Sequence, residues 1–230
     1  SRKIARTLVA FANADGGRLL IGVKDNGTVS GVRVDEELHM IEAAAEMYCR
    51  PAVAFQSQVW KADIRSVLEV VVEPSRHRPH RCEIEEGKWS AFLRLEDENI
   101  QVNAVLARCW DHRFRSDRPA FEYDKNVGKL FRSWRNGKLL GFRQVARTVR
   151  KPAGAVEDLL ALLVGWGIVE MVLGDRNFMY GLADEQALAN LETKGPALFD
   201  LSVLPPSPKV RRLRPRGVRE VDPRALPPEF

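Results

Sequence analysis

Residues 10–27 read AFANADGGRLLIGVKDNG, and this stretch sets the beginning of the fold. Apolar residues recur at helical spacing from Arg2 to Asn13, and the Gly16-Gly17 pair ends that helical pattern. Arg18–Val23 then predicts a short buried strand. The next four residues end in the Asn-Gly pair that is typical of hairpin turns, so residues 28–32 are expected to return beside that strand.

The following segments alternate between helical and extended patterns. Residues 35–48 predict a helix that ends before Pro51, because the residue preceding a proline is pushed out of helical geometry. Strands are expected over residues 52–60, 65–73 and 89–95, and a closing helix over residues 104–110. Residues 1–115 are therefore predicted to form an α+β domain with a mixed or antiparallel sheet.

A different pattern begins near Asp124. Helices are predicted over residues 124–134, 142–149 and 156–166, followed by a hairpin of residues 168–173 and 177–182. Three helices before a β-hairpin is the order of a winged helix-turn-helix, so residues 121–183 are expected to form such a domain. Because seven of the 13 prolines lie beyond position 204, residues 184–230 are expected to be an extended, proline-rich basic tail.

The composition is that of a globular protein. Apolar residues make up 45% and charged residues 29%, which excludes disorder of the whole chain. No apolar run approaches the roughly 20 residues that span a bilayer, and no signal-peptide pattern opens the chain, so no membrane association is expected. Three widely spaced cysteines predict neither a disulfide framework nor a cysteine-rich zinc site, which fits a cytoplasmic protein.

The net charge of +5 is unevenly distributed along the chain. Residues 1–120 carry 18 basic and 18 acidic side chains, and residues 184–230 carry 8 and 7. Residues 121–183 carry 10 basic and 6 acidic side chains, so nearly all of the excess lies there. Since a local excess of positive charge attracts phosphate, the second predicted domain is the expected place for an anionic partner.

The segment from Lys125 to Lys151 holds nine basic residues and no acidic one. In each of its two predicted helices three of them recur at i, i+4 and i+7, so each helix should carry a basic stripe opposite its apolar face. The expected nucleic-acid contacts are Lys125, Lys129, Arg132, Arg135, Lys138, Arg143, Arg147, Arg150 and Lys151. The third helix instead exposes Glu157 and Asp158 near its start, and these repel a phosphate backbone, so strong sequence specificity is not expected.

Residues 10–27 also closely resemble the core motif of the Schlafen-type AlbA-like domain, which is also called the divergent AAA or ATP-binding domain. Shorter matches accompany it at Gly31-Val32, Cys49-Arg50-Pro51, Arg78-Pro79-His80 and Phe92–Leu95. The resemblance covers roughly residues 1–115. It implies the α/β fold of that family, a transcriptional regulator among its functions, and a homo-oligomer.

The glycine pair inside this motif is a candidate phosphate site. Gly16 and Gly17 permit positive φ and a close approach of the backbone to another group. Together with Asn13, Arg18 and Lys24 they form the candidate nucleotide- or phosphate-binding set. The alternative is a tight turn between helix and strand, because the chain has no G-x-x-x-x-G-K-[ST] loop. ATP as a cofactor therefore rests on the resemblance alone.

The resemblance further implies an alternative function, that of a nuclease, since eukaryotic Schlafen proteins are RNA endonucleases that use two glutamates and an aspartate. Such chemistry requires clustered carboxylates that hold a divalent metal against a phosphodiester. Asp25 matches the region of the aspartate and is the candidate catalytic residue, with a plain turn residue as the alternative. The paired glutamates would precede Ser1, so this hypothesis depends on residues upstream of the sequence.

No metal site is predicted within the chain itself. His77, His80 and Cys82 have near-metal spacing, but interleaved arginines oppose the binding of a cation, and a surface loop is expected. In that loop Arg78 and Arg81 are candidate contacts for a nucleic-acid backbone.

These observations favour a nucleic-acid-binding protein, a transcriptional regulator that contacts mainly phosphate and needs no catalytic step. The alternatives are a metal-dependent nuclease, a nucleotide-binding interaction module, and a winged helix that docks proteins. The sequence does not distinguish DNA from RNA as the partner.

Overall fold

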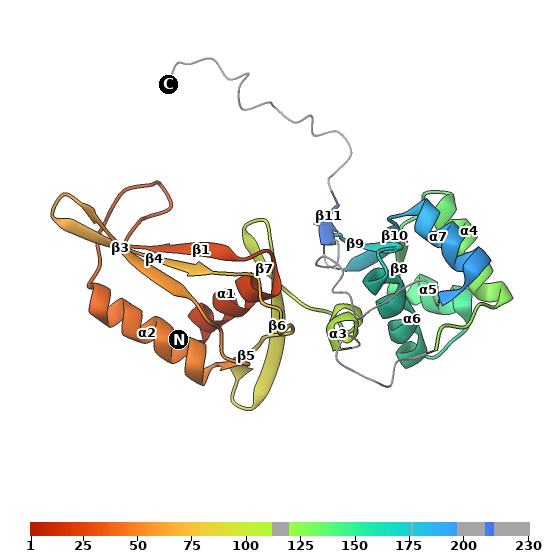
Figure 1. Ribbon diagram of the computed structural model, residues 1–230, viewed down its shortest axis with the longest axis horizontal. Helices are drawn as coiled ribbons and strands as arrows, with labels where there is room; N and C mark the ends of the chain where they lie inside the picture. The colour runs from red at the N-terminus through yellow and green to blue at the C-terminus, as the bar shows by residue number, and fades with distance from the viewer. Residues whose placement is uncertain (112–119, 176, 197–209, 214–230) are drawn as a thin grey trace, which may run out of the picture.

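The computed structural model describes residues 1–111, 120–175, 177–196 and 210–213. Figure 1 shows an N-terminal unit of sheets and two helices, a C-terminal unit that is mostly helical, and helix α3 between them. The sheets of the N-terminal unit are antiparallel throughout. The predicted α+β class is therefore confirmed. No helix in the described part of the chain is long and apolar enough to cross a membrane.

The first sheet is built from three strands. The chain opens with α1 (Arg2–Asn13), and the Gly16-Gly17 turn leads into β1 (Gly17–Ile21). Strand β4 (Arg65–Val72) is central and pairs with β1 on one side and with β3 (Gln56–Ala62) on the other. Helix α2 (Val34–Met47) packs against β4 and α1.

The hairpin predicted directly after β1 is confirmed at its turn, where the Gly27 N–H donates to the Lys24 carbonyl oxygen at 2.8 Å, but it does not extend into a second strand. Residues 28–32 form no strand, but they return antiparallel to residues 22–24 through the Val23–Val29 bridge and through a hydrogen bond of 2.8 Å from the Ser30 N–H to the Gly22 carbonyl oxygen. Strand β1 instead pairs with β4 over the full register from Gly17 opposite Val72 to Ile21 opposite Leu68. Strand β4 is the better partner because its side chains toward the helices are buried and apolar, which residues 28–32 cannot supply.

The second sheet lies against α1. Its order is β2 (Cys49–Arg50), β5 (Arg81–Glu85), β6 (Lys88–Leu95) and β7 (Glu98–Gln101), all antiparallel. Of these four strands only β6 was predicted. Leu8 of α1, Ile41 of α2, Leu68 of β4 and Cys82 of β5 belong to one buried cluster, so both sheets share a core with the two helices.

The C-terminal unit follows the element order predicted for residues 121–183. Its helices are α4 (Lys125–Arg135), α5 (Phe142–Val149), α6 (Ala153–Gly165) and α7 (Glu185–Lys194). Its strands are β8 (Leu140–Gly141), β9 (Val169–Leu173), β10 (Phe178–Leu182) and β11 (Val210–Arg212), in the sheet order β11-β9-β10-β8. Strand β11 runs parallel to β9, and the other pairs are antiparallel.

The expectation of an extended tail from residue 184 is wrong at its beginning. Helix α7 starts there because the Asp184 side chain accepts a hydrogen bond of 2.9 Å from the Ala187 N–H, and Leu188 and Leu191 are buried one turn apart. Residues 197–209 and 214–230 of the predicted tail, including most of its basic segment, lie outside the described residues.

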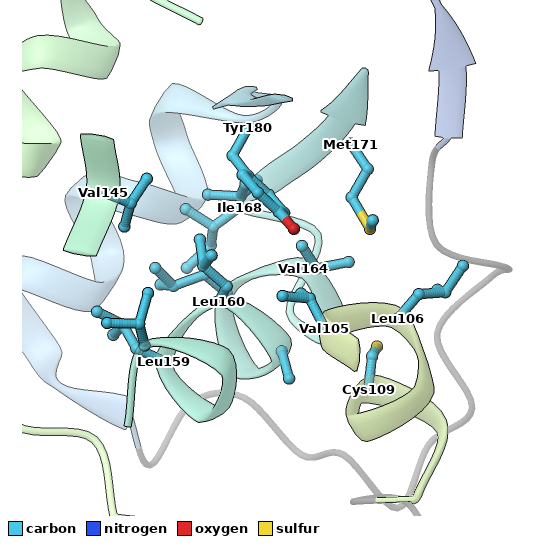
Figure 2. Packing of buried hydrophobic residues seen from close by; sticks show 14 of the residues in the cluster. Val105, Leu106, Cys109, Val145, Leu159, Leu160, Val164, Ile168, Met171 and Tyr180 are labelled. Carbon is cyan, nitrogen blue, oxygen red and sulfur yellow. The ribbon is translucent and has the colours of Figure 1, made fainter. Parts of the chain in front are cut away.

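Helix α3 (Ala104–Asp111) packs on the C-terminal unit. Figure 2 shows Val105, Leu106 and Cys109 of α3 in the same cluster as Leu160 and Val164 of α6. The helix expected to close the first domain therefore supplies apolar side chains to the core of the second unit.

Candidate nucleic-acid interface

The basic stripe of α4 is fixed by the way the helix begins. The Asp124 carboxylate caps it by accepting hydrogen bonds from Asn126 N–H at 2.7 Å and Val127 N–H at 2.9 Å. These bonds stabilise the ionised carboxylate and lower the pKa of Asp124. Because α4 begins at Lys125, its apolar face, which includes Phe131 and Trp134, is buried. The opposite face is exposed and carries Lys125, Lys129 and Arg132.

Helix α5 repeats the arrangement over a shorter length. Its first turn is held by the Gln144 Oε1 atom, which accepts a hydrogen bond of 2.8 Å from the Gly141 N–H. Val145 and Val149 are buried on one face. Arg143, Arg147 and Arg150 are exposed, as is Lys138 in the turn before β8.

Two of the nine predicted basic contacts are engaged in ion pairs. Arg135 donates from Nε to Glu185 Oε1 at 2.7 Å and from Nη2 to Glu192 Oε2 at 2.6 Å, which ties α4 to α7. Lys151 Nζ lies 3.3 Å from Glu122 Oε2 and 3.9 Å from Asp124 Oδ2. The other seven cations have no carboxylate partner within the described ranges. These seven are Lys125, Lys129, Arg132, Lys138, Arg143, Arg147 and Arg150.

Helix α6 does not present the exposed face that was expected. Arg108 of α3 lies 2.6 Å from Asp158 Oδ1 and 2.8 Å from Glu157 Oε2, and these contacts raise the pKa of Arg108. Every residue from Leu159 to Gly165 is buried. The acidic start of α6 is therefore only partly exposed, because Arg108 pairs with its carboxylates and α3 packs on α6. Arg108 was not singled out from the sequence, although it is the only cation on α3.

The glycine turn has a structural explanation. Gly16 has a φ of +83°, and a Cβ there would lie 2.7 Å from the Val72 carbonyl oxygen. A Cβ on Gly17 would lie 2.4 Å from the Phe11 ring. Both positions therefore require glycine for the close approach of α1 and β4. This supports the alternative of a tight turn between helix and strand.

The predicted phosphate-binding residues around this turn are not brought together at one surface. Asn13 is completely buried. Arg18 is exposed and lies 3.4 Å from Glu69 Oε1 on the outer face of the first sheet. Lys24 and Asp25 are exposed in the turn after β1, where the Lys24 carbonyl accepts from the Gly27 N–H at 2.8 Å.

Asn13 holds three peptide groups inside the N-terminal unit. Its Nδ2 atom donates to the carbonyl oxygens of His80 and Phe92, each at 2.8 Å, and its Oδ1 accepts from the His80 N–H at 2.8 Å. The side chain links the end of α1 to β6 and to the segment before β5. It uses both amide hydrogens and its oxygen within the fold and presents none of them to a phosphate.

The surface loop predicted around His77–Cys82 is wrong for residues 78–80, which are buried. Arg78 donates from Nη2 to the Ala14 carbonyl at 2.5 Å and from Nε to the Ala12 carbonyl at 3.3 Å, so its guanidinium caps the end of α1 and lies away from solvent. Arg81 is more open, with its Nη2 atom 3.6 Å from Asp111 Oδ1.

His80 completes this buried network. Its Nδ1 lies 2.9 Å from the Pro51 carbonyl oxygen and its Nε2 lies 2.7 Å from Ser75 Oγ. Burial lowers the pKa of His80. The ring therefore acts in packing and hydrogen bonding.

Asp25, the candidate catalytic residue, is exposed in the turn after β1, and its catalytic role stays a prediction. Across the described residues no three His, Cys, Asp or Glu side chains lie close enough together to hold an ion. The three cysteines are free and buried.

A solved structure, the DIP2311 protein from Corynebacterium diphtheriae, is similar over 86% of this chain with 13% identity and a TM-score of 0.39. The match covers 38% of that protein, so this chain spans well under half of its length. No curated protein matches the chain.

The family comparison concerns the N-terminal unit. Residues 1–103 match the family described as Schlafen, AlbA_2. The match begins at the first residue, includes the glycine turn and both antiparallel sheets, and ends directly before α3. The Schlafen AlbA-like domain predicted from the opening motif is thus confirmed for residues 1–103.

Proposed function

We propose that this protein binds nucleic acid mainly through phosphate contacts, and that its C-terminal unit is a winged helix-turn-helix that supplies most of them. The main support is a set of seven exposed cations on α4, on α5 and in the turn between them. These cations have no carboxylate partner in the described part of the chain. The order α4, β8, α5, α6, β9, β10 fits the winged-helix arrangement. Membership of the N-terminal unit in the Schlafen, AlbA_2 family is compatible with this function.

The covering of α6 supports phosphate-directed rather than base-directed binding. In a helix-turn-helix the second helix of the motif normally reads base edges in the major groove. Here that helix would be α6, whose early acidic residues are paired with Arg108. Phosphate contacts position a protein on nucleic acid without reading sequence, so binding should show weak sequence preference.

A salt titration tests the proposal. If all seven cations contact duplex DNA, the logarithm of the association constant should fall against the logarithm of salt concentration with a slope of about −6, and with a smaller slope if fewer contact it. Fluorescence anisotropy with labelled duplexes of unrelated sequence gives the slope directly. Binding that does not depend on salt would refute phosphate-directed binding and favour the docking of a protein partner.

Matched variants separate specific contacts from net charge. Lys129→Ala and Arg147→Ala should each reduce the magnitude of the slope by about 1, because each removes one released counterion. Arg135→Ala removes the same charge from an ion-paired position and should leave the slope nearly unchanged. Equal effects of all three variants would show that only overall charge matters and would contradict the assigned interface.

A regulatory role in transcription and a homo-oligomeric state belong to this proposal. Sedimentation with and without DNA tests the assembly, and binding to the promoter region of the protein's own gene tests the regulatory role. A location in the cytoplasm is proposed with them, supported by three cysteines that are all free.

A further inference from the structure

A cleft of about 820 Å³ lies where the end of β7, the start of α5 and the hairpin β9–β10 meet. Its volume is within the range of about 300–1,000 Å³ that small-molecule sites occupy. The predicted phosphate contacts reach its lining only at Arg143. The rest of the lining is a mixture of aromatic rings and carboxamides, which differs from the exposed basic stripes.

The inner part of the cleft is held by hydrogen bonds. Asn103 at the start of α3 accepts from the Leu106 N–H at 2.9 Å and donates from Nδ2 to the Tyr180 hydroxyl at 3.0 Å. Tyr180 is buried, and this burial raises its pKa to about 12. The contact joins α3 to β10, so the two sides of the cleft are fixed relative to each other.

Two aromatic side chains line the cleft without being fully buried. Phe142 begins α5 and Phe178 begins β10, and both pack against the C-terminal core while leaving part of their surface open. Aromatic side chains of this kind are platforms for the faces of nucleobases, and base stacking on them is tolerant of sequence. The two rings therefore suit a flat heteroaromatic group.

The polar lining suits the edge of a base. Gln144 uses Oε1 in the cap of α5, which leaves its Nε2 as a donor. The exposed Asn177 side chain adds both a donor and an acceptor. Glu157 pairs through Oε2 with Arg108, and its other oxygen, without a partner in the described ranges, is an acceptor for an exocyclic amino group.

The charges on the two sides of the cleft differ in sign. Arg143 is exposed and has no carboxylate partner within the described residues. Glu157 is largely buried, with 21% of its side chain accessible. A phosphate would be attracted to Arg143 and repelled by Glu157, so a bound nucleotide would place its base inward and its phosphate at the surface.

We propose that this cleft binds one unstacked nucleotide, with the base against Phe142 and Phe178, its edge at Gln144, Asn177 and Glu157, and its phosphate at Arg143. The inference rests on the proposed function when the nucleotide belongs to a strand, because the basic stripes then hold the remaining phosphates. The same chemistry would accept a free mononucleotide. The two sources are separated by experiment.

The test compares three ligands with the full chain at one salt concentration. The ligands are a blunt DNA duplex, the same duplex with a short single-stranded overhang, and free mononucleotides. The overhang should bind about tenfold more tightly than the blunt duplex, in line with the gain from stacking one base. Phe178→Ala should abolish this difference and leave the affinity for the blunt duplex unchanged.

A second variant controls for the case in which Phe178→Ala fails to fold. Asn177 is exposed, and its side chain makes no hydrogen bond to another described residue, so Asn177→Ala should keep the fold and reduce the overhang preference several-fold. Arg147→Ala lies outside the cleft and should weaken both duplexes equally. Circular dichroism of each variant confirms that it is folded.

The outcomes separate the two proposals. Equal, salt-dependent binding of blunt and overhanging duplexes would overturn the cleft proposal and leave the proposed function intact. Binding of a mononucleotide that Phe178→Ala removes, with no binding of either duplex, would support the cleft and overturn the proposed function. If no ligand binds, both are overturned.

Discussion

Replacing Asn13 by alanine should destabilise the protein far more than an average substitution. The change removes three hydrogen bonds of 2.8 Å and leaves the His80 N–H and the His80 and Phe92 carbonyl groups buried without a partner. At roughly 1–1.5 kcal/mol for each buried bond, the expected loss in the free energy of unfolding is about 3–5 kcal/mol. Asn13→Asp should be as damaging, because its carboxylate would face two carbonyl oxygens.

Urea unfolding followed by circular dichroism measures this loss. The matched control is Asn26→Ala, since Asn26 is exposed and accepts one hydrogen bond of 3.1 Å from the Thr28 N–H. That variant should lose no more than about 1 kcal/mol. A loss below about 1 kcal/mol for Asn13→Ala would refute the structural assignment. Loss of phosphate or nucleotide binding at unchanged stability would restore Asn13 as a ligand-binding residue.

Three further predictions follow from buried or paired groups. Because burial lowers the pKa of His80, protonation favours the unfolded chain, so the urea midpoint should fall as the pH drops below 6.5. His80→Gln should flatten that pH dependence, and equal pH profiles of the variant and the unmodified protein would contradict this prediction. Burial raises the pKa of Cys49 to about 12 and that of Cys82 to about 11, so Ellman's reagent should titrate neither thiol near pH 8 until the protein is denatured. Arg135→Ala should lower the free energy of unfolding by about 1 kcal/mol, whereas Lys129→Ala should change it little; equal melting temperatures would show that the α4–α7 ion pairs add no stability.

Local sequence patterns predicted the helices and strands better than they predicted which strands pair. The apolar spacing from Arg2 to Asn13 and the following glycines gave α1 with its observed bounds. Pairing could not be predicted in the same way, because the Asn-Gly turn after β1 favours a local hairpin. The observed partner, β4, begins at Arg65, and it is preferred since it buries apolar side chains against α1 and α2.

The candidate interface was predictable from charge, but the availability of each cation was not. The acids that pair with Arg135 are Glu185 and Glu192, which lie 50 and 57 residues further along the chain. They belong to α7, which was not predicted because the proline-rich composition of residues 184–230 indicated an extended tail. Asp184 and the spacing of Leu188 and Leu191 were a usable signal for that helix. For Asn13 and Arg78 the motif indicated the family correctly, but a match of residue types carries no information about burial.

The position of α3 also determines where the gene could be divided. The family match ends at residue 103, and the next residue begins a helix whose Val105, Leu106 and Trp110 are buried in the cluster of the C-terminal unit. A fragment that starts at residue 104 would carry its own apolar cover for α6. A fragment that starts at residue 121 would expose that surface to water and should aggregate. Recombination or cloning that keeps Asn103 and α3 with the helices after them therefore retains the apolar cover of α6 together with the hydrogen bonds that link Asn103 to α3 and β10.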